Sequence, residues 1–427
     1  MRVLVVYATF EPRLRSAISD HLFAFRRYSQ AACYYVNAVL PTARALITTL
    51  DPDFVIFHTS LLSQRWDRHA MARIERRLWP LRNTRAVKVA LPQDEFLDSD
   101  YLCAFIREFQ VDHVFSVASP SEWPKIYGAL GDEVPAISQV LTGYLEDTSV
   151  ARIDELARTV ARTLDIGYRA WHAEPWLGRH GQLKTELASR FHERGPAHGL
   201  SVDISTRAED TLLGDDWSRF LLSSRYTIGV EGGASILDRD GSLKDRTRSF
   251  QRAQPDATFA DIEQACFPGM DGSLDLRAIS PRHLEACATR TCQVLIDGDY
   301  NGVLRPGVHY VPLRADFSNL DDVIELMKSE NVRQSIAERA RRDIVDSGRY
   351  SYRTFVTAVL AVAPPATARS QRRLRSRVGY GLAAFHENAS WPWLRFRLAL
   401  SRRLIRPLKN ARRMIAGFVG HRVGAAA

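Results

Sequence analysis

Cysteine is scarce in this sequence, and its spacing excludes two common uses of the residue. The cysteines form no CxxC pair and no spacing typical of a metal site; they are Cys33, Cys103, Cys266, Cys287 and Cys292. Reduced thiols in a cytosolic protein show this pattern, whereas secreted disulfide scaffolds do not. The cysteine usage therefore predicts a cytoplasmic location.

Long apolar runs are also missing. No stretch approaches the ~18 apolar residues that a membrane-spanning helix needs. The apolar segment 1–10 is too short for a signal peptide and predicts a first β-strand instead. The chain has 427 residues, 45% of them hydrophobic and 25% charged. This length and composition are typical of a soluble globular protein of two or three domains.

Acidic residues are almost absent from the last part of the chain. Residues 365–427 hold fourteen Lys and Arg against the single acid Glu387, so this tail has a formal charge of +13. Since the whole chain carries +9, the other 364 residues carry −4. The basicity belongs to an appendage, and the rest of the protein gives no signal for nucleic-acid binding.

Apolar residues alternate with arginines in this basic tail. They are Trp391, Trp393, Leu394, Leu398, Leu400, Leu404, Ile405 and Leu408. This composition is typical of a helix that lies on an anionic membrane, and equally of a solvated basic extension. Pro392 and Pro407 limit the expected helix to residues 393–406. Base stacking on the aromatic residues is the only route to a nucleic-acid function, which we regard as the weakest interpretation.

The first part of the chain alternates short apolar strands with helices. Strands are expected over residues 2–8, 53–58, 86–91 and 113–117, and helices over 16–28, 43–50, 68–78 and 101–109. This alternation predicts a parallel, doubly wound sheet, in which ligands lie beyond the carboxyl ends of the strands. The polar residues at those ends are His58, Thr59, Gln93, Asp94, Glu95, Ser116 and Ser119.

A second α/β region follows a helix expected over residues 150–166. Strands are expected over 200–204, 226–230, 293–296 and 308–313, and helices over 217–223, 281–289, 321–327, 336–345 and 349–362. We interpret residues 167–184 as irregular and 236–276 as a long loop or insertion, because their periodicity is weak. The predicted fold class is α/β, with two Rossmann-like domains, mainly parallel sheets and a basic C-terminal helical tail.

Residues 279–320 organise the second region. Pro281 opens a helix, since its missing N–H would lack a partner in the first turn anyway. Arg282, His283 and Glu285 fall in that turn. The order that follows is strand, loop, strand and helix, so the polar helix start points to whatever lies above the sheet. Helix starts in such positions bind phosphates and sugars through their unpaired N–H groups.

This stretch resembles the nucleotide-sugar half of GT-B glycosyltransferases, and in particular the glycosyltransferase family 1 or CgeB-like group. Arg282, Glu285 and Ala286 match the Arg-x-x-Glu-Ala pattern of that group, and a Pro-Gly turn and an Asn-Leu-Asp-Asp helix start follow. The resemblance extends over residues 1–362. It implies a GT-B fold and transfer of a sugar from a nucleotide-diphosphate sugar to an acceptor hydroxyl, in cell-surface glycan synthesis.

The resemblance also implies a domain organisation. An N-terminal Rossmann-like domain on the acceptor side spans residues 1–165, and a nucleotide-sugar domain spans 166–348. A helix at 349–364 then crosses back to the first domain, before the basic tail at 365–427.

Cations and one carboxylate are the first candidates for the donor site. The resemblance implies that Arg179 and Lys184 grip the diphosphate, while Arg282 lies near the phosphates. It also implies that Glu285 binds the ribose, since a carboxylate accepts hydrogen bonds from two vicinal hydroxyls. The alternative interpretations are two surface cations and an ordinary first-turn acid that the helix dipole stabilises.

A glycine-containing segment is a second candidate for nucleotide-sugar binding. Gly232, Gly233 and Ser235 follow the strand at 226–230. The glycines let the backbone approach a ligand, and Ser235 can cap the next helix toward a phosphate or a sugar hydroxyl. A plain strand-to-loop turn is the alternative.

Asp94 and Glu231 are the candidate catalytic residues. Asp94, or its neighbour Glu95, can act as a base on the acceptor hydroxyl if the reaction inverts configuration. Retaining GT-B enzymes often have two glutamates seven residues apart, and this chain departs from that pattern. Glu231 and Glu285 would have to take these two parts across a long segment, so the stereochemical outcome stays open.

No metal ligand and no cofactor are expected, because the resemblance implies catalysis without a bound metal and a nucleotide sugar as donor substrate. Asp238-Arg-Asp240 imitates a DxD metal motif but, with Gly241 after it, is more simply a turn. The expected partners are the nucleotide sugar, a glycan or small-molecule acceptor, and an anionic membrane surface through the tail. The expected location is the cytoplasm, with peripheral attachment to the inner face of the membrane.

Two other functions stay open at this point. One is a different GT-B chemistry, of the epimerase or phosphorylase type. The other is a non-catalytic GT-B-like binding protein that holds an anionic partner with its basic tail. Hydrolysis of a nucleotide sugar without acceptor separates the chemistries, and a filter-binding test of the tail addresses the binding protein.

Overall fold

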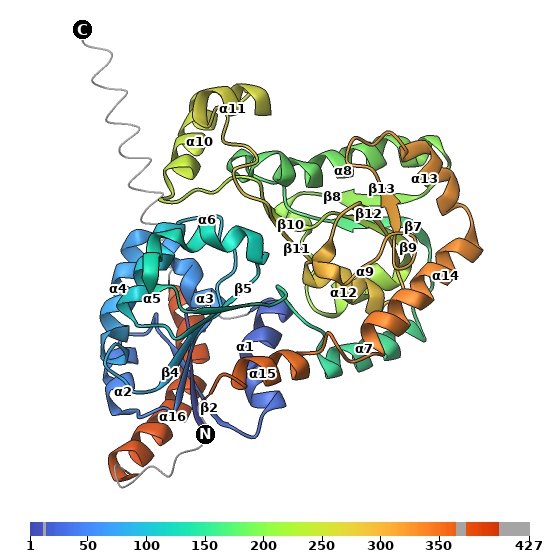
Figure 1. The fold of residues 1–427 in the computed structure, drawn as a ribbon. Coiled ribbons are helices and arrows are strands. Elements are labelled where there is room, and N and C mark those ends of the chain that lie inside the picture. The colour runs from blue at the N-terminus through green and yellow to red at the C-terminus, as the bar shows by residue number, and fades with distance from the viewer. Residues whose placement is uncertain (12–13, 364–372, 401–427) are drawn as a thin grey trace, which may run out of the picture.

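The computed structural model describes residues 1–11, 14–363 and 373–400. These residues form two α/β domains side by side, each built around one parallel sheet (Figure 1). Cysteines in the described residues are all free thiols, as expected. Within the described residues, none of the helices is both long and apolar enough to span a membrane.

The first domain contains a six-stranded sheet in which every neighbouring pair is parallel, with the order β2-β1-β3-β4-β5-β6. The strands are β1 (Arg2–Tyr7), β2 (Ala32–Asn37), β3 (Phe54–Phe57), β4 (Val87–Ala90), β5 (His113–Ser116) and β6 (Ala136–Gln139). From Val3 to Tyr7 the first strand is fully buried, because helices cover both faces of the sheet. The strand order reverses beside β1, which is where such sheets bind ligands.

The helices of the first domain follow the predicted pattern closely. They are α1 (Ser16–Tyr28), α2 (Ala43–Thr49), α3 (Thr59–Leu62), α4 (Arg68–Leu78), α5 (Ser99–Glu108) and α6 (Trp123–Tyr127). Predicted and observed bounds agree to the residue for α1 and α4. The sequence analysis did not predict the edge strand β2.

The second domain contains a five-stranded parallel sheet with the order β13-β12-β9-β7-β8. Its strands are β7 (Leu164–Arg169), β8 (Val202–Ser205), β9 (Ser224–Gly229), β12 (Cys292–Ile296) and β13 (Val311–Leu313). Its helices are α7 (Asp147–Ala157), α8 (Gly178–Ala197), α9 (Asp215–Ser223), α12 (Pro281–Ala288), α13 (Leu320–Met327) and α14 (Glu330–Ala340), and one π-helical turn follows at Arg341–Val345.

Two predictions for the start of this domain are wrong. The helix expected over residues 150–166 ends at Ala157, and Leu164–Arg169 forms the strand β7. The region 167–184, interpreted as irregular, contains the first two turns of α8. The predicted domain limit at residue 165 falls inside β7, which begins one residue earlier. α7 precedes that limit but already packs against α9 of the second domain.

The segment 236–276, which the sequence suggested to be a loop, contains two helices. They are α10 (Ser242–Ala253) and α11 (Phe259–Cys266), and they lie between the short antiparallel strands β10 (Gly232–Ala234) and β11 (Leu276–Ala278). This insertion contacts the first domain through backbone bonds. The Asp238 N–H donates to the Phe96 carbonyl at 2.8 Å, and the Asp98 N–H donates to the Asp238 carbonyl at 2.7 Å.

The chain returns to the first domain after α14. α15 (Tyr352–Leu360) packs against α1 and buries Tyr352, Phe355 and Val359 in the core beneath β1 and β3. α15 lies within the range 349–364 predicted for the crossing helix. Two Rossmann-like domains with parallel sheets and a returning last core helix form the GT-B fold, as the sequence predicted.

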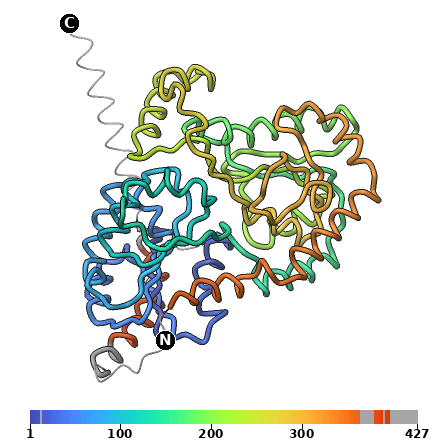
Figure 2. The backbone as a smooth tube through the Cα atoms, viewed as in Figure 1, coloured from blue at the N-terminus to red at the C-terminus, as the bar shows by residue number. Residues whose placement is uncertain are grey.

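A further helix, α16 (Arg373–Leu400), packs on β2 and α2 (Figure 2). The expected helix limits of 393–406 are wrong at their first residue, because α16 starts twenty residues earlier and continues through Pro392. The ring of Pro392 lies on an exposed side of the helix. The predicted tail residues 365–372 and 401–427 lie outside the described residues.

Candidate functional site

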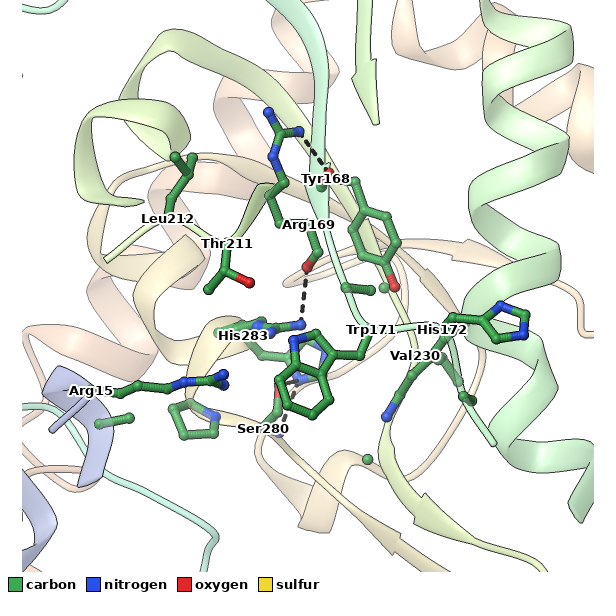
Figure 3. A pocket seen from close by; sticks show the side chains of 18 of the residues that line it. Arg15, Tyr168, Arg169, Trp171, His172, Thr211, Leu212, Val230, Ser280 and His283 are labelled. Atoms are coloured by element: carbon green, nitrogen blue, oxygen red, sulfur yellow. Dashed lines mark hydrogen bonds between the residues drawn. The ribbon is translucent and has the colours of Figure 1, made fainter. Parts of the chain in front are cut away.

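A cavity of about 680 Å³ lies between the two domains, at the carboxyl ends of both sheets (Figure 3). The first domain lines it with the start of α1 and the loop after β4. The second domain contributes the loops after β7 and β9, the inner side of α8 and the start of α12. Polar residues of this lining include Arg15, Asp94, Lys184, Arg282, His283, Glu285 and Gln293.

The start of α12 is held open toward the cavity by its own residues. The Ser280 N–H donates to Nδ1 of His283 at 3.1 Å, which fixes the first turn. Burial lowers the pKa of His283 to about 3, and the positive charges of Arg282 and Lys184 act in the same direction. The imidazole is therefore neutral, as an acceptor at Nδ1 must be. Figure 3 shows Ser280 and His283 together at the cavity wall.

Glu285 lies one turn further along the same helix and lines the cavity, as predicted. Its carboxylate accepts a hydrogen bond of 2.7 Å from Nε1 of Trp217 on α9. Burial raises the pKa of Glu285, while the bond from Trp217 and the charge of Arg282 oppose that rise. Because a carboxylate has about four lone-pair sites, Glu285 retains acceptor capacity for a ligand.

Arg282 and Lys184 place two positive charges on the second-domain side of the cavity. The Arg282 guanidinium donates to the Arg169 carbonyl at 3.0 Å and lies 6.0 Å from the centroid of the Trp217 ring. Burial lowers the pKa of Lys184, and so does the nearby charge of Arg282. In the part of the chain that the structure describes, neither cation forms an ion pair with a carboxylate within 4.0 Å.

Asp94 faces these cations from the first domain. Its backbone is left-handed, with φ of 52°, and its carbonyl accepts a bond of 2.8 Å from the buried guanidinium of Arg65. Burial raises the pKa of the Asp94 carboxyl, and the charges of Arg65 and Lys184 oppose that rise. The attraction between Asp94 and Lys184 therefore acts between the two domains.

Arg179 is separated from the cavity, although it precedes Lys184 by only five residues. Its side chain is 65% exposed and pairs with Glu263 and with Asp271, the latter at 3.3 Å from Nε to Oδ2. Its backbone N–H also donates to Asp271 at 3.0 Å. Asp271, from the α10–α11 insertion, thus occupies the start of α8. Arg179 does not line the cavity, so its predicted diphosphate role has no support in this geometry.

Ser235 serves the same helix start from the other side. Its hydroxyl donates to Asp271 at 2.7 Å and accepts from the His180 N–H at 3.2 Å. Gly178 opens α8 with φ of 77°, and a Cβ there would meet the Ser235 hydroxyl at 2.2 Å. Ser235 is therefore packed against the protein's own backbone, outside the cavity lining.

Gly232 and Gly233 have different roles. Gly232 lines the cavity. Gly233 does not, and it has φ of 126°, a conformation that favours glycine; a Cβ there would lie 1.9 Å from the Leu276 carbonyl. Gly233 is needed for the pairing of β10 with β11, so its requirement is structural.

Glu231 precedes these glycines, but its carboxylate does not reach the cavity lining. Oε1 accepts a 2.7 Å bond from the Tyr300 N–H, and the turn at Gly298 packs directly against Oε2. Burial raises the pKa of Glu231, and the Tyr300 N–H opposes the rise. The structure thus supports a role for Glu231 in holding the turn after β12, and its predicted catalytic role has no geometric support.

The neighbour of Asp94 is also directed away from the cavity. Glu95 is fully buried and accepts hydrogen bonds from the Ser116 hydroxyl at 2.6 Å, the Val117 N–H at 3.0 Å and the Tyr127 hydroxyl. Of the two adjacent acids, the structure leaves only Asp94 facing the cavity. His58, another residue at a strand end, bonds His21 at 2.9 Å in the core.

Several lining residues were missed by the sequence analysis. Arg15 reaches from the start of α1 to Trp171 of the second domain, with 4.9 Å from its Cζ to the ring centroid, and Figure 3 shows the two side by side. Trp217 bonds Glu285, as described above. Gln293 on β12 is 1% exposed, and its Oε1 has no partner among the described protein atoms. A glutamine inside an otherwise apolar strand was the one available signal.

Solved structures of similar overall design include several with UDP-sugars. Anabaena HepE in complex with UDP and glucose is 11% identical, with 84% of this chain and 98% of that chain covered and a TM-score of 0.46. An α-glucosyltransferase in complex with UDP-glucose and DNA containing an abasic site is 11% identical, with 84% of this chain and 98% of that chain covered and a TM-score of 0.48. AviGT4, a glycosyltransferase involved in avilamycin A biosynthesis, is 12% identical, with 84% of this chain and 96% of that chain covered and a TM-score of 0.42.

No protein-family model and no curated protein matches the chain. The similarities to solved structures are too low to transfer a substrate or a residue role.

Proposed function

We propose that this protein is a glycosyltransferase that moves a sugar from a nucleotide-diphosphate sugar to an acceptor hydroxyl. The observation that carries the proposal is the pair of cations Lys184 and Arg282, which form no ion pair with a carboxylate within 4.0 Å among the described residues and line one interdomain cavity beside the start of α12. A diphosphate bound there would bring negative charge into direct contact with these two groups. The positive end of the helix dipole at the start of α12 favours the same ligand.

The donor is oriented by the second domain. Lys184 and Arg282 bind the diphosphate, and their charge stabilises the nucleoside diphosphate as it leaves, which is the largest electrostatic demand of the reaction. Glu285 accepts hydrogen bonds from the ribose hydroxyls, while Trp217 fixes the orientation of its carboxylate. Gly232 allows the backbone to approach the donor, and the fully buried Gln293 offers a further acceptor to it.

The acceptor binds from the first domain, where Asp94 lies across from Lys184. In this proposal Asp94 takes the proton of the attacking hydroxyl. Burial raises the pKa of its carboxyl, which makes it a stronger base than an exposed aspartate. This assignment corresponds to an inverting reaction. Arg179, Gly233, Ser235 and Glu231 stay sequence predictions, and the proposal gives them no contact with the donor.

We extend the proposal to catalysis without a bound metal, because Lys184 and Arg282 supply the positive charge that a metal ion provides at the diphosphate in other transferases. The role in cell-surface glycan synthesis and the cytoplasmic location rest on the family resemblance and the cysteine usage. The alternatives of the epimerase or phosphorylase type and of a non-catalytic binding protein share the same cavity, so only an activity measurement separates them.

A thermal-shift screen of nucleoside diphosphates tests the proposal first. A ligand at one hundred times its dissociation constant stabilises the folded protein by about 2.7 kcal/mol. The nucleotide found in this way identifies the donor series for assays of sugar transfer to candidate glycans, with hydrolysis of the nucleotide sugar as the readout in the absence of acceptor. Lys184→Ala should reduce the shift to about half or less, and the matched variant Arg179→Ala should retain it. A protein that no nucleoside diphosphate or nucleotide sugar stabilises would refute the proposal.

A further inference from the structure

α16 has an inner apolar face that belongs to the first domain. Tyr380, Ala383 and Leu394 are buried against that domain. The ring of Tyr380 lies 4.2 Å from that of Tyr34 on β2, and Trp391 stacks on Tyr7 at 6.4 Å. The helix is thereby fixed to the sheet edge, and its other sides have a definite orientation.

The outer side of α16 carries a second row of large apolar side chains. Leu382 is 49% exposed, Phe385 70%, Trp393 39% and Phe396 66%. At ~100° per residue these four positions fall within about 80° of each other around the helix axis. They form two pairs on one side of the helix, which together we call the outer stripe of α16. Exposed apolar patches of this kind mark interaction surfaces rather than ordinary protein surface.

The charge around the outer stripe indicates its partner. The segment 365–427 contains fourteen Lys and Arg, and its single acid is Glu387. Both carboxylate oxygens of Glu387 accept hydrogen bonds from the Arg26 guanidinium of the first domain, at 2.7 and 2.6 Å. The one negative charge of this segment is therefore used to hold α16 in place, and the remaining formal charge of the segment is positive, which suits a partner that is apolar beneath and negative at its surface.

We propose that the outer stripe of α16 docks this protein on an anionic membrane surface. Aromatic and leucine side chains enter the boundary between headgroups and acyl chains, and the flanking cations bind the anionic headgroups. A second copy of the chain is a poorer occupant, because each copy would bring the same positive segment to the contact. Nucleic acid would use the cations and the rings but has no use for Leu382.

The placement of α16 gives this docking a direction. Tyr380 lies beside Arg2, at 5.5 Å, where β1 begins, whereas Trp391 stacks on Tyr7, where β1 ends. α16 thus runs along the strands, and its C-terminal end lies at the carboxyl edge of the sheet. The interdomain cavity lies at this same edge, so a docked protein has its cavity on the side of the C-terminal end of α16.

Vesicle co-sedimentation of the full chain tests the proposal, with phosphatidylcholine vesicles that contain or lack phosphatidylglycerol. The test variant is Phe385→Asp with Phe396→Asp. The matched control is Leu326→Asp with Val134→Asp, two residues that are similarly exposed, 42% and 44%, on other surfaces. We expect the parent and the control to bind the anionic vesicles, and the test variant to bind them at least about tenfold more weakly.

Thermal unfolding and nucleotide binding of each variant show that loss of vesicle binding is not loss of folding. Equal vesicle binding by the test variant and the parent would overturn the proposal. Absence of vesicle binding by the parent would also overturn the proposal, and two further results would then identify what the stripe binds instead. A parent dimer that the test variant converts to monomer would assign the stripe to a second copy. Vesicle binding that appears only after removal of residues 401–427 would assign it to the chain's own end.

Discussion

Two helix starts in the second domain, those of α8 and α12, carry residues that were predicted to bind the donor, and the structure separates them. Each follows a loop beside the sheet. The start of α8 is filled by Asp271 and Ser235 of the same chain. The start of α12 is held by Ser280 and His283, and opens to the cavity. The His283 N–H also bonds the Ser280 carbonyl, at 3.1 Å, so the two helix starts differ in which of them faces the cavity.

The same comparison explains why Arg179 and Lys184 separate. Five residues along a helix correspond to a rotation of about 140°, so one side chain faces the insertion when the other faces the cavity. Arg179 pairs with Glu263 and Asp271, and Lys184 faces Asp94 and Arg282. The predictions below use variants on the two sides of α8, and on α12, to break or sharpen this difference.

The largest expected effect is on turnover and comes from Asp94, opposite the inner side of α8. Asp94→Asn removes the proposed base and preserves the size of the side chain. General bases contribute roughly 10²–10⁴-fold to rate. We expect kcat for sugar transfer to fall by about that factor while nucleotide affinity changes little. Steady-state kinetics with a saturating donor measures it, and an unchanged kcat would remove Asp94 from the mechanism.

The pH dependence of the parent follows from the same residue. A base must be deprotonated to act, and burial raises the pKa of Asp94. Activity should therefore fall as pH decreases through that raised pKa, above the value of about 3.9 at which an exposed aspartate titrates. The acid limb of kcat/KM approaches about tenfold loss per pH unit. In Asp94→Asn the residual activity should lose this limb.

Lys184→Ala should have the next largest effect, on donor binding. Hydrogen bonds to charged groups contribute about 1.5–3 kcal/mol, which corresponds to roughly a tenfold to 150-fold loss of affinity for the nucleoside diphosphate. The unfolding free energy should change little or rise, since burial and Arg282 disfavour the charged amine in the empty site. Isothermal titration calorimetry gives the affinity. Binding equal to that of the parent would contradict the assignment.

Glu285→Gln tests the α12 side of the comparison. The variant keeps an acceptor for Trp217 but loses the charge and gains a donor that the ribose hydroxyls do not match. We expect roughly ten- to a hundredfold weaker nucleotide binding, about 1.4–2.8 kcal/mol, with little change in thermal stability. Glu285→Ala should bind more weakly still. For a deoxyribose analogue of the nucleotide, the same substitutions should cause a smaller loss of affinity, because fewer hydroxyls remain for Glu285 to bind.

Arg179→Ala should have the smallest effect on the donor. The side chain is 65% exposed and its partners are the insertion residues Glu263 and Asp271. Exposed ion pairs contribute about 0–1 kcal/mol, so a slight loss of thermal stability is the main expected change. Nucleotide affinity should stay within about threefold of the parent, below 1 kcal/mol. A loss comparable to that of Lys184→Ala would place the diphosphate at the start of α8.

Much of the fold was predictable because its signals are local. The alternation of buried strands with amphipathic helices predicted α1 and α4 to the residue. The missed β2 is a sheet edge beneath α16, and its first residues are partly exposed. The start of α8 looked irregular because Gly178 and Gly181 interrupt it, yet both glycines lie where a Cβ would meet a neighbour, Ser235 or Leu177, at less than 3 Å.

The candidate site was predictable only in part, because partners distant in sequence decide where a side chain lies. Arg179 bonds Asp271, which is 92 residues away, and Glu231 bonds Tyr300, 69 residues away. No local sequence pattern predicts either partner. Lys184, Arg282, Glu285 and Asp94 do line the cavity, since strand ends and helix starts are fixed by the topology of parallel sheets.

Hydrogen–deuterium exchange with and without a saturating nucleoside diphosphate tests the central claim most directly. The claim is that the diphosphate binds at the start of α12 and the inner side of α8. It predicts slower exchange of the Arg282 N–H in the first turn of α12, where the His283 N–H already bonds the Ser280 carbonyl, with no change at Arg179 and His180, whose N–H groups bond Asp271 and Ser235. Slower exchange at the start of α8, with α12 unchanged, would contradict the account.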